Sequence, residues 1–157
     1  MIQVGESIPA VSITIISNEE QKTVAANDYF SGKKVVLIAV PGAFTPTCSE
    51  AHLPGFVVKY DEVIGKGIDE IVCLSVNDSF VMKSWQAAQN AEKITMLADG
   101  GATFTRSLGL EIDTADFGGV RSRRYSMVID NGVVSILNAE EKTGYEVSDV
   151  DTLLSQL

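Results

Sequence analysis

The segment KKVVLIAV, residues 33–40, places the tightest constraint on how this chain can fold. Its last six residues are all apolar, so polar and apolar side chains do not alternate along it. A run of this kind predicts a strand that is buried on both faces, as in the centre of a parallel sheet. The segment PGAFTPTC, residues 41–48, follows at once and carries two prolines and a cysteine. The chain therefore passes directly from a core strand to a residue with reactive chemistry.

The rest of the chain alternates strands with helices. Strands are predicted at 11–16, 69–77 and 94–99, helices at 47–66, 79–91, 102–110 and 148–157, and a hairpin over 124–140 around an Asp-Asn-Gly turn. Pro54 lies inside the first of these helices and should kink or break it. Strands joined by helices predict a largely parallel sheet, to which the hairpin adds an antiparallel pair. The fold class is therefore a three-layer α/β sandwich with a mixed β-sheet, similar to the thioredoxin fold.

The composition suits one domain over residues 1–157, with 45% hydrophobic residues. The net charge of −9 repels phosphate backbones and anionic lipid, so neither nucleic acid nor a membrane is an expected partner. No apolar run approaches the ~20 residues that span a bilayer. The N-terminal MIQVGESIPA lacks the charged and apolar regions of a signal peptide, so a cytoplasmic location is expected. A chain whose organelle-targeting segment had been removed would look the same.

The chain holds two cysteines, Cys48 and Cys73, and one histidine, His52. Two cysteines in 157 residues do not indicate a secreted disulfide scaffold. Cys48 and His52 supply only two ligands at metal-binding spacing, so no metal site is expected. The cysteines are therefore either inert or redox-active.

The position of Cys48 favours a reactive thiol. Free thiols have a pKa of about 8.5, so only a few per cent is present at pH 7 as the nucleophilic thiolate. Pro46 is suited to the start of a helix, which puts Cys48 in the first turn. Unpaired N–H groups and the positive end of the helix dipole favour an anion there. Taken alone, Cys48 would be better interpreted as a small buried hydrophobe, and the surrounding residues reverse that interpretation.

The octapeptide P-G-A-F-T-P-T-C resembles the active-site motif P-x-x-x-T/S-x-x-C of peroxiredoxins. The similarity extends to SEAHLPGF (49–56), VCLSVND (72–78), FVMKSW (80–85) and RSRRYSMVIDNG (121–132), which look like the type-5 (type II) subfamily. The resemblance covers nearly the whole chain. It implies a thioredoxin fold with an N-terminal β extension, and a thiol-dependent peroxidase that needs an external thiol but no cofactor.

The resemblance also implies roles for four residues. Cys48 would be the peroxidatic cysteine and Thr45 its hydroxyl partner, while Pro41 shields the site. Arg124 would be the active-site arginine, which stays charged and offers several donors in a fixed fork. Thr45 has a simpler reading as a helix N-cap. Strand alternation that turns Arg124 inward would leave Arg123 facing solvent.

Four further residues are candidates for the substrate pocket. Gly42, Phe44 and Phe117 are expected near it, although both phenylalanines would also suit the core. His52 follows Cys48 by four residues and so shares its helix face. His52 either aids Cys48, lines a surface where the reductant docks, or is a partly exposed structural histidine.

Cys73 is the candidate resolving cysteine. It lies within IVCLSV, where a strand buried on both faces makes a thiol inert, and joining it to Cys48 would require local unfolding. Some type-5 relatives carry a resolving cysteine late in the chain, but residues 138–150 hold none. The sequence therefore indicates a one-cysteine enzyme reduced by glutathione, glutaredoxin or thioredoxin, with a Cys48–Cys73 disulfide as the alternative. The resemblance implies a homodimer.

Three rival functions share parts of this pattern. A thioredoxin-type oxidoreductase would need C-x-x-C, whereas Thr45 stands where its first cysteine would be. A cysteine hydrolase built on Cys48 and His52 lacks an evident orienting residue. A redox sensor or holdase would use the same Cys48 but react only once, whereas a peroxidase turns over.

Overall fold

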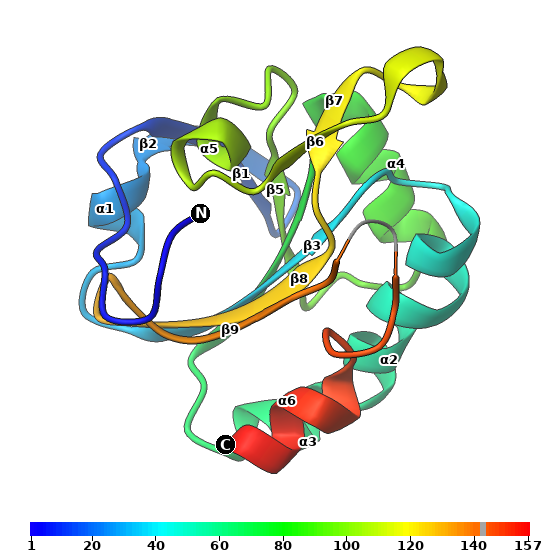
Figure 1. Ribbon diagram of the computed structural model, residues 1–157. Helices are drawn as coiled ribbons and strands as arrows, with labels where there is room; N and C mark the ends of the chain where they lie inside the picture. Colours follow the sequence, from blue (N-terminus) through cyan, green and yellow to red (C-terminus); the bar gives the residue numbers. More distant parts are fainter. Residues whose placement is uncertain (142–143) are drawn as a thin grey trace.

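The computed structural model describes residues 1–141 and 144–157 (Figure 1). Within these residues, a seven-stranded mixed sheet has the order β2-β1-β5-β4-β3-β8-β9. Its strands are β1 (Ser12–Ser17), β2 (Glu20–Ala25), β3 (Lys34–Val40), β4 (Glu70–Ser75), β5 (Thr95–Ala98), β8 (Tyr125–Asp130) and β9 (Val133–Ala139). The central strands β3, β4 and β5 run parallel, while β1 and β8 pair antiparallel with either side of this group.

The apolar run at 35–40 forms most of β3, as predicted. All six of its residues are fully buried, because β3 is covered on both faces of the sheet. Val36, Ile38 and Val40 belong to one core cluster, and the residues between them belong to the other. The fold therefore has three layers, and the thioredoxin-like α/β prediction is confirmed.

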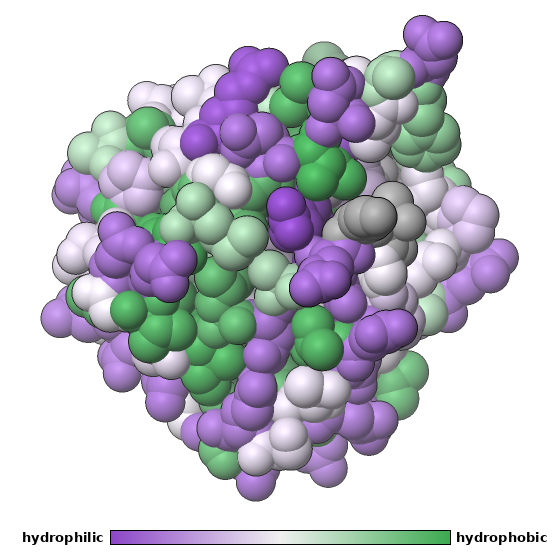
Figure 2. Space-filling view, viewed as in Figure 1, coloured by the Kyte–Doolittle hydropathy of each residue, from purple (hydrophilic) through white to green (hydrophobic). Residues whose placement is uncertain are grey.

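Helices cover both faces of the sheet (Figure 1). The π-helical turn η1 (Cys48–His52), α2 (Leu53–Val58), α3 (Tyr60–Ile64), α4 (Ser79–Ala88) and α6 (Val150–Gln156) lie on one face. The short helices α1 (Ala26–Tyr29) and α5 (Thr103–Ser107) lie on the other. Figure 2 shows hydrophilic residues over much of one side of the molecule, with apolar residues gathered in front of β9. No helix among the described residues combines the length and the hydrophobicity that crossing a bilayer requires.

The sequence pattern missed β2, α1 and a small second sheet. β2 is an edge strand whose sequence, EQKTVA, is mostly exposed, so it shows no apolar alternation. The strands β6 (Glu111–Asp113) and β7 (Val120–Ser122) have three residues each, and the 3₁₀ turn η2 (Ala115–Phe117) connects them. Segments this short give no periodic signal.

The predicted helix over 47–66 is divided into η1, α2 and α3. Pro54 is the second residue of α2, and α2 directly follows the π-helical turn. A proline cannot donate the usual hydrogen bond to the carbonyl four residues earlier, and a wider turn relieves the clash of its ring with that carbonyl. The helix is interrupted at Lys59, which has φ −100° and ψ 19°. Pro54 therefore widens the helix, and the break itself lies five residues later.

A polar network ties the amino ends of the parallel strands together. Glu70, the first residue of β4, accepts hydrogen bonds from Tyr29 at 2.7 Å, from Lys33 at 3.0 Å and from Thr95 at 2.6 Å. These donors come from α1, from the residue before β3 and from the first residue of β5. The network lies at the opposite end of β3 from Pro41 and Cys48.

Candidate active site

The loop after β3 places Cys48 at the carboxyl end of the central strand. Pro41 directly follows the last residue of β3, and helical backbone begins at Pro46. Cys48 therefore lies in the first turn of the helix, and only 1% of its surface is exposed. Beneath it, the Trp85 indole N–H of α4 donates to the Ser49 hydroxyl at 2.9 Å, which fixes the start of the helix.

Gly42 and Thr45 are held against each other in this loop. The Thr45 hydroxyl donates to the Gly42 carbonyl at 2.6 Å, and the Thr45 backbone N–H reaches the same oxygen at 3.4 Å. A Cβ atom on Gly42 would lie 3.1 Å from Thr45 Cγ2, so glycine permits this close approach. The hydroxyl proton of Thr45 is used here, and no N–H of the described residues donates to its oxygen, as an N-cap would require. Its lone pairs remain available to accept a hydrogen bond from a bound ligand.

Phe44 has a left-handed backbone, with φ 63°. That conformation costs a bulky residue on the order of 1–3 kcal/mol. The neighbouring Ala43 N–H donates to Asn77 Oδ1 at 3.0 Å, which ties the loop to the segment after β4. The Phe44 side chain is 55% exposed and does not line the pocket described below, contrary to its prediction as a pocket wall. The left-handed turn carries the side chain outward.

Arg124 connects the cysteine with the histidine. One guanidinium nitrogen, Nη2, donates to Cys48 Sγ at 3.1 Å, and Nη1 lies 3.1 Å from His52 Nδ1. Arg124 directly precedes β8, and the next residue, Tyr125, is paired with Ala39 of β3. The sheet register therefore brings Arg124 level with the end of β3, where the Cys48 loop begins. Tyr125 is buried on the other face, so alternation turns Arg124 toward the site.

The guanidinium of Arg124 is a buried cation without a carboxylate partner among the described residues. Only 4% of its surface is exposed, and its Nε has no hydrogen-bond partner in the described chain. A buried charge is costly unless an opposite charge or a hydrogen bond compensates it. The groups that meet Arg124 are a neutral imidazole and the sulfur of Cys48. Of these two groups, only the sulfur of Cys48 can carry a negative charge that would compensate the guanidinium.

His52 is fully buried, so the prediction of a partly exposed histidine or a docking surface is wrong. Its Nε2 lies 3.0 Å from the Ser148 carbonyl oxygen, and its Nδ1 faces Arg124. An arginine only donates, so Nδ1 must be the acceptor and Nε2 must carry the proton. Burial, followed by the charge of Arg124, lowers the pKa of His52 to about 3. The imidazole is therefore neutral at physiological pH and fixed in one tautomer.

Two neighbours of His52 and Arg124, the aromatic Tyr145 and the basic Arg123, were not predicted in these positions. The Tyr145 ring lies 5.4 Å from the His52 ring and 5.7 Å from the Arg124 guanidinium carbon. Arg123 is half-buried and donates to the Glu140 carbonyl at 3.2 Å, whereas alternation predicted that it would face solvent. The pairing of Tyr125 with Ala139 brings Glu140 beside this segment, and its carbonyl holds the Arg123 guanidinium there.

An open pocket of about 730 Å³ leads to these groups. Its lining is largely apolar, with the polar Thr47 and Asp113 among its exposed residues and the buried Arg124 at its base. The lining residues are Pro41, Thr45, Pro46, Thr47, Ile112, Asp113, Thr114, Phe117 and Arg124. Phe117 is 69% exposed and stands at the rim. Ile112 was not predicted as a pocket residue, because no signal in the sequence indicated the β6–β7 sheet to which it belongs.

Cys73 faces the same core cluster as Cys48 but is completely buried within β4. Both thiols are free. Burial, with the nearby charge of Cys48, raises the pKa of Cys73 far above its ordinary value. Cys73 is therefore held as an unreactive thiol in this conformation.

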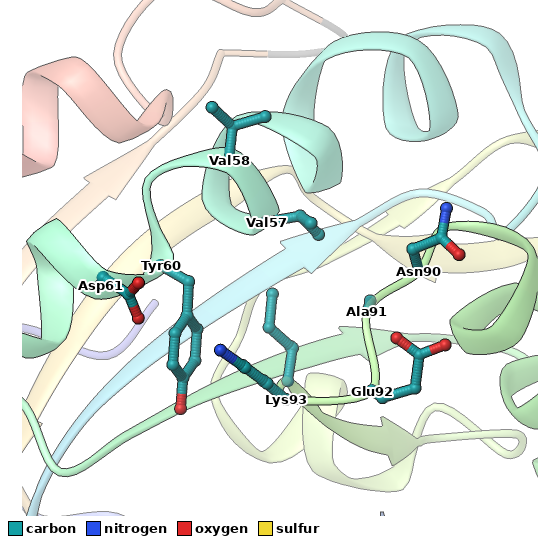
Figure 3. A pocket seen from close by; sticks show the side chains of 9 residues that line it. Val57, Val58, Tyr60, Asp61, Asn90, Ala91, Glu92 and Lys93 are labelled. Atoms are coloured by element: carbon teal, nitrogen blue, oxygen red, sulfur yellow. The ribbon is translucent and has the colours of Figure 1, made fainter.

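A second pocket, shown in Figure 3, lies between the ends of α2 and α3 and the segment 90–94. Its charged residues are Asp61, Glu92 and Lys93, and the Lys93 ammonium lies 5.6 Å from the Tyr60 ring. The pocket contains neither a cysteine nor any of the predicted site residues. The predicted site residues Pro41, Thr45 and Arg124 instead line the pocket above Cys48.

A helix-start cysteine that contacts a buried arginine, beside a threonine with free lone pairs, defines a thiol-based redox enzyme on a thioredoxin-like fold. Comparison with known proteins gives the family. The Redoxin family profile matches residues 3–154. Peroxiredoxin-2D of Arabidopsis thaliana is 45% identical over 159 aligned positions, covering 99% of this chain and 98% of that protein.

Two solved structures extend the comparison. Reduced Prx3 of Vibrio vulnificus in complex with H2O2 is 55% identical with a TM-score of 0.96, and the match covers 99% of each chain. Peroxiredoxin 5 of Alvinella pompejana is 35% identical with a TM-score of 0.84, covering 99% of this chain and 97% of that one. The chain belongs to the peroxiredoxin family, consistent with its type-5 (type II) branch, and so is a thiol-dependent peroxidase.

The low pKa of His52 makes stability dependent on pH. Below pH about 6.5 the unfolded chain protonates its histidine, but the folded chain does not until about pH 3. Stability that is present above pH 6.5 is therefore lost as the pH falls through this window. When the pH is lowered from 7.5 to 5.5, the free energy of unfolding of the wild type should fall by about 1.4 kcal/mol more than that of His52→Asn. Asparagine keeps a hydrogen-bond acceptor at this position but does not titrate. Urea unfolding at the two pH values measures this difference, and equal losses would contradict it.

Proposed function

We propose that the protein reduces hydrogen peroxide and small alkyl hydroperoxides through a sulfenic acid on Cys48. The observation that carries this proposal is the contact at 3.1 Å between Arg124 and the Cys48 sulfur, at the base of a pocket that Thr45 also lines. A buried cation beside a helix-start sulfur favours the thiolate, which is the form that attacks peroxide.

The reaction transfers one oxygen atom to sulfur. The Cys48 thiolate attacks the terminal oxygen of the hydroperoxide, so an S–O bond forms and the O–O bond breaks. Sulfur is oxidised by two electrons, and the other oxygen leaves as hydroxide or alkoxide and takes a proton from water. Arg124 donates to the oxygens as negative charge moves from sulfur to the leaving group. The lone pairs of Thr45 accept the hydroperoxide O–H and hold its terminal oxygen toward sulfur.

Two observations support these substrates. The relative from Vibrio vulnificus was solved with H2O2 bound, and it aligns over 99% of this chain. The rim of the pocket carries apolar side chains, Ile112 and Phe117 among them, which suit a short alkyl group. A peroxide oxygen would bind at the polar base, and its alkyl group would extend along this rim.

Removing the sulfur nucleophile should abolish activity. Cys48→Ser should reduce peroxide consumption, with dithiothreitol as donor, by at least about 10³-fold, because a serine hydroxyl is not ionised at neutral pH. A peroxide electrode or a dye assay measures the consumption. Residual activity of Cys48→Ser near the wild-type level would contradict the proposal. A wild type that consumes only one equivalent of peroxide would instead indicate a redox sensor.

We infer that an external thiol, from glutathione, glutaredoxin or thioredoxin, reduces the sulfenic acid. Three observations support this inference. Cys73 is fully buried in a central strand, residues 138–150 contain no cysteine, and the helix start that carries Cys48 is fixed by Trp85. A disulfide between the two cysteines would require this packing to open.

The one-cysteine route makes Cys73 dispensable. Cys73→Ser should retain peroxide turnover within about twofold of the wild type with dithiothreitol or with glutathione and glutaredoxin, because the buried thiol takes no part in the cycle. Parallel assays with thioredoxin and its reductase identify the preferred donor. A mass spectrum of peroxide-treated wild type containing a Cys48–Cys73 peptide would establish the alternative route.

We also propose a homodimer that forms next to the active site. Phe44, Phe80 and Phe117 are 55%, 81% and 69% exposed, which is unusual for aromatic side chains. Their three segments are joined by hydrogen bonds. The Ala43 N–H donates to the Asn77 side chain, three residues before Phe80. The Arg121 guanidinium donates to the carbonyl of Val76 and to that of Gly118, which follows Phe117. A second copy of the chain would cover these rings.

The dimer proposal is tested by a charge placed among these rings. Phe80→Glu should convert a dimer to a monomer at micromolar concentration, because dimerisation would bury the carboxylate without a partner. Val58→Glu is the matched control, since Val58 is also 81% exposed but lies on α2 outside these segments. Sedimentation velocity reports the mass. A wild type that is monomeric at tens of micromolar would refute the proposal.

A further inference from the structure

Glu140, the residue after β9, is a buried carboxylate with an unusual set of partners. Only 3% of its surface is exposed. A single oxygen, Oε2, accepts hydrogen bonds from the backbone N–H groups of Glu146, Val147 and Ser148, each at 2.9 Å, and from the Ser148 hydroxyl at 2.7 Å. Successive N–H groups that converge on one anion fix the backbone of their segment. Glu140 therefore sets the conformation of residues 146–148.

That segment is the outer contact of the active site. The carbonyl of Ser148 accepts a hydrogen bond from the Nε2–H of His52 at 3.0 Å. This contact determines which imidazole nitrogen remains free to accept a hydrogen bond from Arg124. The Ser148 N–H and hydroxyl bind Glu140 while its carbonyl binds His52. A change in the position of Ser148 would thus be transmitted directly to the imidazole.

Glu140 also contacts the arginine segment through its own backbone. Its N–H donates to the Arg124 carbonyl at 2.9 Å, and its carbonyl accepts from Arg123 at 3.2 Å. One residue thus fixes both the main chain of Arg124 and, through Ser148 and His52, the end of its guanidinium. Hydrogen bonds from Ser148, Val147 and Glu146 hold the pKa of Glu140 below its usual range, although burial alone would raise it.

We propose that Glu140 is a positioning residue for the reaction of Cys48 with peroxide. It acts by fixing the 146–148 segment, which holds His52 in the tautomer that accepts from Arg124. A correctly placed Arg124 then donates to the sulfur and to the peroxide oxygens. Glu140 does not touch substrate. This inference rests on the proposed peroxidase reaction.

The test uses Glu140→Gln, which keeps the size of the side chain but removes its charge and one of its two acceptor oxygens. Because the chain has a single histidine, the imidazole ¹⁵N signals of the whole protein report His52 alone. The wild type should show one neutral tautomer with the proton on Nε2. Glu140→Gln should show both tautomers. Single-turnover oxidation of Cys48 by H2O2, followed by the fluorescence of the only tryptophan, should slow roughly tenfold.

Glu70→Gln is the matched control, because Glu70 also accepts several hydrogen bonds but lies at the other end of the sheet. It should lower the melting temperature and leave both the ¹⁵N spectrum and the oxidation rate unchanged. If Glu140→Gln does not fold, Ser148→Ala removes one of the four hydrogen bonds and should still give a mixed tautomer. A native tautomer and a native rate in the folded variant would overturn the proposal. A wild type that peroxide does not oxidise would instead overturn the proposed function.

Discussion

The buried guanidinium of Arg124, held between the Cys48 sulfur and the His52 ring, is the interaction on which the rest of the site depends. A cation at 4% exposure is tolerated only where something compensates its charge, and no carboxylate does so among the described residues. Of the two described side chains that Arg124 hydrogen-bonds, only the sulfur of Cys48 can become an anion. The sheet register that brings Arg124 level with the end of β3 places this cation against the sulfur.

The two ends of the parallel strands carry different tasks. At the amino ends, Glu70 gathers Tyr29, Lys33 and Thr95 into a closed network that joins four elements. At the carboxyl ends, the chain accepts a left-handed Phe44 and an arginine whose Nε lacks a partner in the described residues. Ligand sites of open α/β sheets lie at this end of the strands. The carboxyl ends thus combine a strained bulky residue with an incompletely hydrogen-bonded arginine at the candidate site, whereas Glu70 gathers its donors at the amino ends.

The parts of this structure that can be predicted from sequence are those with a regular hydrophobic pattern or a recognisable motif. The apolar run of β3, the Asn-Gly hairpin and the octapeptide around Cys48 predicted the thioredoxin-like fold and the position of the candidate site. β2 was missed because an exposed edge strand has no apolar alternation. The burial of His52 was missed because it depends on a contact with Ser148, which is 96 residues away in the sequence. Glu140 was missed because it lies in an acidic stretch, which is typical of solvent-exposed surface. Such contacts exist only once the sheet has brought the segments together.

The choice of a histidine beside Arg124 follows from the same charge balance. A carboxylate at that position would accept the same hydrogen bond, but its charge would neutralise the guanidinium and compete with sulfur and peroxide for it. A neutral imidazole orients Arg124 and leaves its positive charge available. The negative charge of Glu140 is engaged by three backbone N–H groups and a hydroxyl, so it fixes the loop while His52 separates it from the arginine. Among the described residues, the site thus orders its groups so that no carboxylate competes with the proposed nucleophile, Cys48, for Arg124.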